Sequence, residues 1–216
     1  MVIIITKINS ERQLTNLSQS LVNTEPMMVH DSGLLVAVEN NEVYQNTRQK
    51  VDSFFDGLDN TTASLVISQP NFNLIEDGTN HIQGMPKDSF VVIYNSDYVI
   101  PRGCVKSMVD YLRFYHGLGI ISAMEVGEEN VSQVVGNIYE PSGYLTIDNS
   151  QMKMQCTDGG LYAVDLVRDN LFAIRKNELD ELLSNETPYE SCWGLSLRKC
   201  GYMNAVETNI TIRKEV

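Results

Sequence analysis

The stretch Phe90-Val-Val-Ile-Tyr94, followed by Asn95-Ser96-Asp97, decides the fold of this chain. An unbroken apolar run of this length is typical of a strand that is buried on both faces, and such strands occur in parallel sheets covered by helices. The triplet then places amide, hydroxyl and carboxylate groups where the strand ends. Ligands of open α/β sheets bind at the carboxyl ends of the strands. The stretch therefore predicts both a central strand and a candidate binding site.

Short apolar runs alternate with amphipathic stretches on both sides of this strand. The predicted strands cover 2–6, 34–38, 63–67, 90–94, 120–123, 161–167, 171–174, 203–206 and 209–212, with an extended run at 27–30 and a hairpin over 131–139 and 144–147. The predicted helices cover 9–21 (with Ser10 as N-cap), 43–58, 78–84, 103–116, 176–183 and 190–199. This order predicts a single α/β domain: a mostly parallel central sheet flanked by helices, with a more mixed C-terminal part.

The composition narrows the class of protein and of partner. The 216 residues carry a formal net charge of −12, whereas proteins that hold nucleic acid by its phosphates normally show a basic surface, so we expect no nucleic-acid partner. The first apolar run is far shorter than the ~20 residues of a membrane-spanning helix, and neither a membrane span nor a leader is expected. The four cysteines have neither a C-x-x-C pair nor metal-finger spacing, which predicts free thiols in a reducing, cytoplasmic compartment.

Polar side chains also follow the two strands that come first in the chain. After the first strand come Thr6, Lys7, Asn9 and Arg12, and at the end of the extended run at 27–30 comes the turn His30-Asp31-Ser32-Gly33. Because the carboxyl ends of parallel strands meet at one edge of a sheet, groups at three strand ends can form one site. Each group by itself could equally be a turn or a solvated surface charge, since Asn, Asp, Ser and Gly are common turn residues.

Taken together, these motifs resemble the nucleotide-sugar glycosyltransferases of the GT-A fold, particularly family-2-like members. In that family an Asn lies about fifteen residues before an apolar strand that ends in D-x-D or N-x-D, and a Pro and a helix follow. Here Asn80, the triplet and Pro101 stand in that order. The turn at 30–33 is similar to the family's D-x-x-S turn, and 189–202 is similar to its acidic motif and L-x-x-R-x-x-x-G-Y helix. The chain also resembles the N-terminal glycosyltransferase domain of chlorella-virus enzymes that build capsid glycans.

The resemblance implies a role for each of these motifs. Asp97 would be the protein ligand of a Mn²⁺ or Mg²⁺ ion that bridges the donor's phosphates, while Asn95 replaces the first Asp of D-x-D and supplies no charge. Such a cation needs only one or two carboxylates beside phosphate oxygens, and it would reconcile an acidic protein with an anionic donor. The implied nucleotide-binding residues are Thr6, Lys7, Asn9, Arg12, Asp31, Asp77, Asn80, Asn95, Ser96 and Asp97.

The catalytic base is less clearly marked than the donor site. Inverting members use the Asp of an E-D pair to deprotonate the acceptor hydroxyl, but the pair here is Glu190-Ser191, and a serine cannot act as a base unaided. Glu190 itself and Asp158, in Thr157-Asp158-Gly159-Gly160, are the two candidate catalytic residues. A retaining enzyme would need no such base.

The resemblance thus implies a metal-dependent glycosyltransferase that moves a sugar from a UDP-sugar to a glycan or glycoprotein hydroxyl. One domain would span 1–216, with a nucleotide-binding half (1–125) and an acceptor-side half (126–216). Two alternatives stay open. A nucleotidyltransferase of similar architecture usually carries a Gly-rich, Lys-containing loop after its first strand, and Lys7-Ile-Asn-Ser10 has no glycine. A non-catalytic nucleotide- or carbohydrate-binding module is favoured by the absence of Asp at positions 95 and 191.

Overall fold

The strand β4 (Phe90–Asn95) lies inside the sheet, between β1 (Val2–Ile8) and β10 (Leu171–Arg175). Its residues 90–94 are all buried, so the prediction of a strand covered on both faces is confirmed. The computed structural model describes residues 1–28, 32–56, 63–126, 132–133, 138–140, 143–145, 160–164, 167, 170–184, 197 and 201–214.

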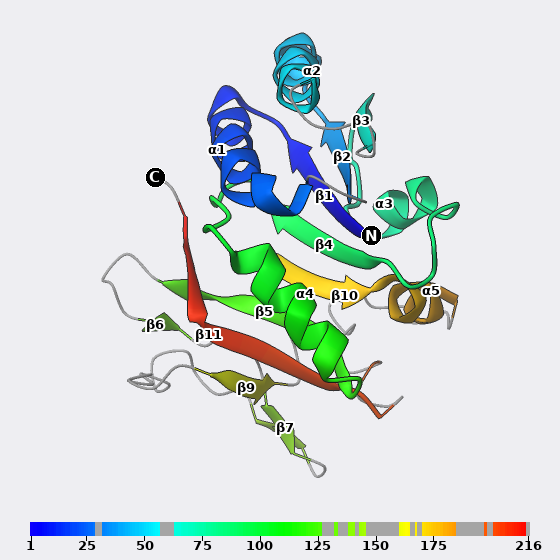
Figure 1. Ribbon diagram of the computed structural model, residues 1–216, viewed down its shortest axis with the longest axis vertical. Helices are drawn as coiled ribbons and strands as arrows, with labels where there is room; N and C mark the ends of the chain where they lie inside the picture. The colour runs from blue at the N-terminus through cyan, green and yellow to red at the C-terminus, as the bar shows by residue number, and fades with distance from the viewer. Residues whose placement is uncertain are drawn as a thin grey trace.

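Strands and helices alternate through the first half of the chain (Figure 1). The other elements of the first half are α1 (Glu11–Met28), β2 (Ser32–Val38), α2 (Asn41–Phe55), β3 (Ala63–Ser68), α3 (Glu76–His81), α4 (Cys104–Phe114) and β5 (Leu118–Val126). Those of the second half are β6 (Ser132–Gln133), β7 (Ile138–Glu140), β8 (Gly143–Leu145), β9 (Leu161–Val164), α5 (Lys176–Ser184) and β11 (Met203–Arg213).

Within the described residues the main sheet has nine strands, in the order β3-β2-β1-β4-β10-β5-β11-β9, with β6 paired to β5. Pairs among β1, β2, β3 and β4 are parallel, whereas β10 runs antiparallel to both β4 and β5. It follows that β5 has the same direction as β4, and β11 is parallel to β5. The fold is the predicted α/β domain with a mostly parallel sheet and a more mixed C-terminal part. The carboxyl ends of β1, β2, β4, β5 and β11 therefore lie at one edge of the sheet.

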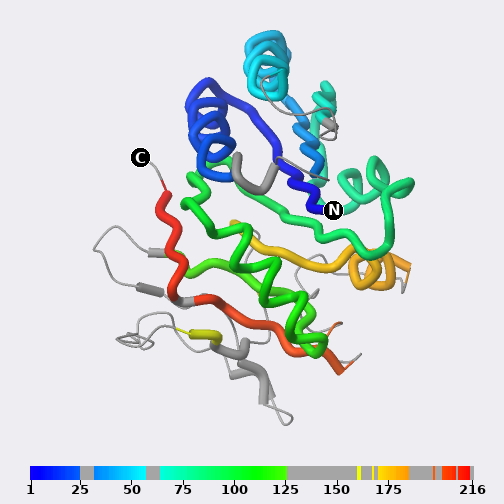
Figure 2. The backbone as a smooth tube through the Cα atoms, viewed as in Figure 1, coloured from blue at the N-terminus to red at the C-terminus, as the bar shows by residue number. Residues whose placement is uncertain are grey.

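Helices cover both faces of this sheet (Figure 2). Successive side chains of β4 point to opposite faces of the sheet and pack into two separate hydrophobic cores. Val92 and Tyr94 belong to the core that α1, α2 and α4 cover. Val91 and Ile93 belong to the core on the side of α3 and α5. Burial of both faces explains why the strand carries no polar residue before Asn95. The residues of β4 just before Asn95-Ser96-Asp97 are therefore packed into a hydrophobic core on each face of the sheet.

Some boundaries differ from the sequence-based prediction. The extended run at 27–30 is wrong for its first two residues, because α1 continues past Pro26 to Met28, although a proline removes one backbone donor. Ser32 and Gly33, which were predicted to lie in a turn after a strand, instead begin β2 opposite Val2 and Ile3. They therefore lie at the amino end of the parallel strands and not at the carboxyl edge. The two strands at 203–206 and 209–212 form the single strand β11, whose register against β5 shifts between Glu207 and Thr211. The hairpin is confirmed for β7 and β8, but residues 132–133 of its predicted first arm form β6, which pairs with β5 instead. Of the helix at 190–199 only Leu197 lies within the described residues, and it is helical.

Two further sequence-based expectations concern thiols and membranes. Cys104 is a buried free thiol, as predicted, and the other three cysteines lie outside the described residues. Among the helices of the described part, none has both the length and the apolar character that a membrane crossing requires.

Candidate functional site

Asp97, the last residue of the triplet, is the centre of a polar cluster at the carboxyl edge of the sheet. Gln13 Nε2 donates a hydrogen bond to Asp97 Oδ1 at 2.9 Å. Arg12 Nη2 lies 3.5 Å from the same oxygen, and Lys214 Nζ lies 3.6 Å from Oδ2. Partial burial raises the pKa of Asp97, but the Gln13 hydrogen bond and the charges of Lys214 and Arg12 outweigh it and lower the pKa overall. Asp97 is therefore an ionised carboxylate at neutral pH.

Backbone and side-chain hydrogen bonds fix the loop that carries Asp97. Asn16 Nδ2 donates to Ser96 O at 2.9 Å, and Ser96 Oγ donates to Lys7 O at 2.5 Å. On the other side, Asn95 N donates to Asn170 O at 2.8 Å. Asn95 Oδ1 accepts from Asp97 N at 2.9 Å. The Asn95 amide oxygen thus closes the turn that presents Asp97, and Ser96 ties this turn to β1.

The polar residues at the carboxyl end of β1 and just after it have different roles in the structure. β1 runs two residues further than predicted, so Thr6 and Lys7 belong to the strand and only Asn9 and Arg12 follow it. The Thr6 side chain is buried and donates to Tyr94 O at 2.8 Å, so it joins β1 to β4. Lys7 Nζ lies 3.3 Å from Glu39 Oε1, at the end of β2. Asn9 N donates to Gln13 Oε1 at 2.6 Å, and the predicted N-cap Ser10 accepts from Gln13 N at 3.3 Å. Gln13 therefore connects the start of α1 with the carboxylate of Asp97.

The two predicted nucleotide residues near α3 interact with their own neighbourhood. Asp77 Oδ2 accepts from Asn73 N at 2.8 Å and so stabilises the start of α3. Asn80 is exposed, and its Oδ1 accepts from Gln83 Nε2 at 3.1 Å. The loop before α3 does reach the site, because Phe72 O accepts a bond from Lys7 Nζ at 3.5 Å. Asp31, Asp158 and Glu190 lie outside the described residues.

The structure adds three residues that sequence reasoning did not select: Gln13, Glu125 and Lys214. Glu125 lies near the end of β5, where its Oε1 accepts from Tyr98 Oη at 2.7 Å and its Oε2 from Asn170 Nδ2 at 2.9 Å. It thereby braces the residue that follows Asp97. Gln13 follows Arg12 in the first turn of α1, and that position was the available signal for it. Nothing in the local sequence around Lys214 marks it, because only the packing of β11 brings it to Asp97.

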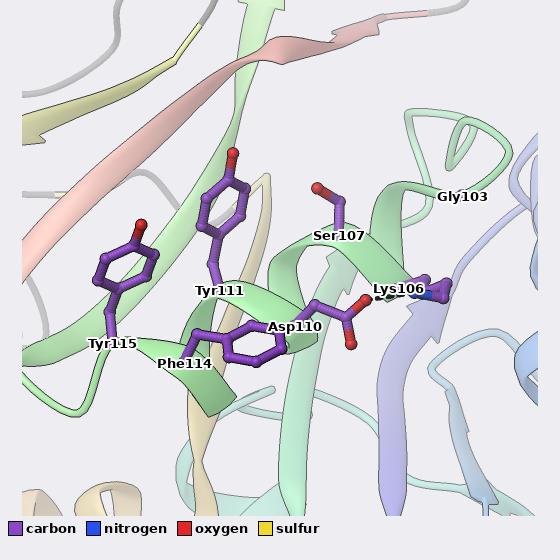
Figure 3. Close-up of a pocket in the computed structure, with 7 residues that line it drawn as sticks. All are labelled: Gly103, Lys106, Ser107, Asp110, Tyr111, Phe114 and Tyr115. Carbon is purple, nitrogen blue, oxygen red and sulfur yellow. Dashed lines mark hydrogen bonds and ion pairs between the residues drawn. The ribbon is translucent and has the colours of Figure 1, made fainter.

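A separate cavity of about 430 Å³ lies along α4 (Figure 3). Its lining residues are Gly103, Lys106, Ser107, Asp110, Tyr111, Phe114 and Tyr115. The Tyr111 and Tyr115 rings are stacked there at 6.1 Å between centroids, and Lys106 pairs with Asp110. None of the predicted site residues lines this cavity. The strand ends are therefore the better candidate site, because ligands of open α/β sheets bind there.

The metal-ligating side chains near Asp97 show whether this site could hold the predicted divalent cation. Among the described residues, no group of three or more His, Cys, Asp or Glu side chains could form a protein cage for a metal. Asp97 supplies one ionised carboxylate whose side chain is 25% exposed. That is enough for Mg²⁺ or Mn²⁺ when a diphosphate provides most of the other oxygens. A cation that enters together with a phosphate ligand would fit this site, and Asp97 is the carboxylate that would hold it.

No protein-family profile matches the chain, and a search of curated proteins finds no match either. Solved structures do match, at low sequence identity. GalNAc-T7 with UDP, GalNAc and Mn²⁺ aligns with a TM-score of 0.66 and 9% identity, over 99% of this chain and 43% of that one. The mannosyltransferase PcManGT from Pyrobaculum calidifontis, in complex with GDP-Man and Mn²⁺, aligns with a TM-score of 0.60 and 14% identity, over 98% of this chain and 56% of that one.

A third match is the nucleoside-diphosphate-sugar pyrophosphorylase from Vibrio cholerae, with a TM-score of 0.57 and 13% identity over 98% of this chain and 94% of that one. The chain has the GT-A fold. Glycosyltransferases and nucleotidyltransferases share this fold, so the likeness establishes the GT-A architecture but not one activity within it. The chain spans about half the length of GalNAc-T7 and of PcManGT.

The hydroxyl of Tyr94, at the end of β4, stabilises the loop that carries Asp97. It is buried, bonds to Ser20 Oγ at 2.9 Å and donates to Tyr98 O. Tyr94→Phe should lower the free energy of unfolding by about 1–3 kcal/mol, because Tyr98 O loses its buried partner. Urea denaturation measures this, with Tyr44→Phe as control: Tyr44 Oη makes only a 3.4 Å bond to Val66 O, and about 0.5 kcal/mol or less is expected. Equal losses in both variants would contradict this role of the Tyr94 hydroxyl.

Proposed function

We propose that this chain is a glycosyltransferase that transfers a sugar from a UDP-sugar to a glycan or glycoprotein hydroxyl, with Mn²⁺ or Mg²⁺. The observation that carries the proposal is the ionised Asp97, which Arg12 and Lys214 flank at the carboxyl edge of a GT-A sheet. A single carboxylate between two cations suits a ligand that brings both negative charge and metal. The choice of UDP, and a role in capsid glycan synthesis, rest on the sequence resemblance alone.

The residues at the site would have different roles in binding the donor and in the reaction. Asp97 would hold the divalent cation, which when bound stabilises the negative charge of the departing diphosphate. Arg12 would bind a phosphate oxygen from the first turn of α1, where the helix dipole also favours an anion. The Asn95-Ser96 turn keeps Asp97 in position. Glu190 and Asp158 stay the proposed candidates for accepting the proton of the acceptor hydroxyl.

Thermal unfolding with nucleotides tests the donor assignment. UDP with Mn²⁺, at 100 times its Kd, should stabilise the protein by about 2.7 kcal/mol. For a chain of this size that is a rise in Tm of about 5–10 °C. GDP, CMP and buffer, each with and without Mn²⁺, are the matched controls. A shift with UDP and Mn²⁺ no larger than with GDP or CMP would overturn the donor assignment, and UDP binding without any UDP release from UDP-sugars would favour a binding module.

A nucleotidyltransferase is the second candidate, and the lengths of the matched structures favour it. The chain covers 94% of the pyrophosphorylase from Vibrio cholerae and 89% of the 4-diphosphocytidyl-2C-methyl-D-erythritol synthase from Anaerococcus prevotii, against about half of the two glycosyltransferases. The segment at the end of β1, Lys7-Ile8-Asn9-Ser10, has no glycine, and this argues against a nucleotidyltransferase. Release of pyrophosphate from UTP or CTP in the presence of a sugar phosphate would decide for the nucleotidyltransferase.

A further inference from the structure

Three cationic side chains from distant parts of the chain meet at the carboxyl edge of the sheet. Lys7 comes from the end of β1, Arg12 from the first turn of α1, and Lys214 directly follows β11. Two carboxylates face them: Glu39 pairs with Lys7, and Asp97 with both of the others. The three cations thus outnumber the two carboxylates that pair with them, in a protein whose formal net charge is −12. Another carboxylate at this edge, Glu125, accepts hydrogen bonds from Tyr98 and Asn170.

The backbone fixes Lys214 at this place. Beyond its register shift, β11 continues beside β5 with Ile212 opposite Glu125, and Ile212 is buried. Two residues further on, Lys214 forms an antiparallel β-bridge with Tyr98, the residue after Asp97. Figure 1 shows the C-terminal end of β11 on the same side of the molecule as α1. The position of this lysine is thus set by strand pairing and not by its exposed side chain.

The contact between Lys214 and Asp97 contributes little to the stability of the fold. Both side chains are partly exposed, Lys214 at 58% and Asp97 at 25%, and exposed ion pairs contribute at most about 1 kcal/mol. Arg12 is 48% exposed and shares the same carboxylate. One negative charge between two solvent-accessible cations leaves an excess positive charge, which an anionic ligand can use.

We propose that Lys214 is a donor-binding residue that, together with Arg12, binds the diphosphate of the nucleotide sugar. The inference rests on the proposed function, and it adds to it a residue that comes from the end of the last strand. In the free protein, Asp97 holds both cations beside the place where the phosphates bind. When the donor binds, its phosphate oxygens take over these charge-assisted contacts, and Asp97 is released to hold the divalent cation. The C-terminal strand is then part of the donor site.

Isothermal titration calorimetry with uridine, UMP and UDP, in EDTA and in Mn²⁺, tests the role of Lys214. Lys214→Met keeps the apolar stem and should weaken UDP binding about tenfold, because a charge-assisted bond is lost, while uridine binding stays within about twofold. Lys214→Arg should restore most of the affinity. Lys106→Met is the matched control: this exposed lysine pairs with Asp110 on α4, and its loss makes the same change of net charge.

The possible results separate the two proposals. If wild-type protein binds uridine and UDP but Lys214→Met binds UDP equally well, the role of Lys214 is overturned and the proposed function stands. If Lys106→Met weakens UDP binding as much as Lys214→Met does, the effect is one of net charge, and the role of Lys214 is again overturned. If wild-type protein binds neither UDP nor uridine, both proposals fail. Because the bridge to Tyr98 is made by the backbone, the Tm of Lys214→Met should match that of the wild type.

Discussion

Asp97→Asn should reduce sugar transfer by about 10²–10³-fold, the loss typical when one group that stabilises developing charge is removed. The substitution keeps the shape of the side chain and removes the only charge that the Asn95-Ser96-Asp97 triplet carries. In Mn²⁺, UDP should bind the variant no more tightly than it does in EDTA, since the cation has lost its carboxylate ligand. In EDTA the variant should bind UDP at least as well as the wild type, because Arg12 and Lys214 no longer pair with Asp97.

Calorimetry with UDP and a UDP-release assay measure the two parts of this prediction. Asp88→Asn is the control, because Asp88 is an exposed carboxylate in the turn before β4 and loses the same charge. Mn²⁺ that still tightens UDP binding to Asp97→Asn as much as to the wild type would remove Asp97 from the metal site. The Tm of both variants should stay near that of the wild type, because exposed ion pairs stabilise the fold little.

Arg175→Met should lower the free energy of unfolding by about 3–5 kcal/mol, the range for removing one partner of a buried charge pair. Arg175 Nη1 donates to Leu118 O at 2.7 Å, and Nη2 donates to Tyr115 O at 3.0 Å and also to Leu112 O. It thereby satisfies the carbonyls at the C-terminal end of α4, which lack partners within the helix. Its fourth partner is Glu178, whose side chain is 2% exposed.

The loss should grow with pH, because it leaves Glu178 without its cation. Burial raises the pKa of Glu178 to about 7, while Arg175 acts to lower it. Without Arg175 the folded-state pKa rises further above the unfolded value. A raised carboxyl pKa means that the folded state holds the proton more tightly, so stability falls as pH increases from about 4.5 through the folded-state pKa. The deficit of Arg175→Met should therefore be larger at pH 8 than at pH 5.

Urea denaturation at pH 5 and pH 8 measures both effects. Arg48→Met is the control: Arg48 makes an exposed ion pair with Asp52 at 3.6 Å, and a change of about 0.5 kcal/mol or less is expected. Adding Glu178→Gln to Arg175→Met should remove the dependence on pH but not the loss at the end of α4. A deficit that is the same at both pH values would show that Glu178 is not coupled to Arg175.

Elements were easier to predict from the sequence than contacts between them. The apolar run at 90–94 predicted its strand because burial on both faces excludes polar residues from every position. Boundaries were predicted less well: the helix predicted to end at residue 21 runs to Met28 in the structure. β11 was divided into two strands because its polar residues around 207–209 break the apolar pattern. In the structure the strand continues through that point, and its pairing with β5 resumes at Thr211 after a shift in register.

The sequence by itself determined the α/β class, the central strand and the carboxylate at its end, because hydrophobic periodicity records locally which faces become buried. Only the tertiary structure decided what surrounds that carboxylate. The partners Gln13, Arg12 and Lys214 come from α1 and from the far end of the chain, and they meet at Asp97 because parallel strands bring their carboxyl ends to one edge. A contact between distant segments depends on strand order and register, and neither is encoded in the residues next to Lys214.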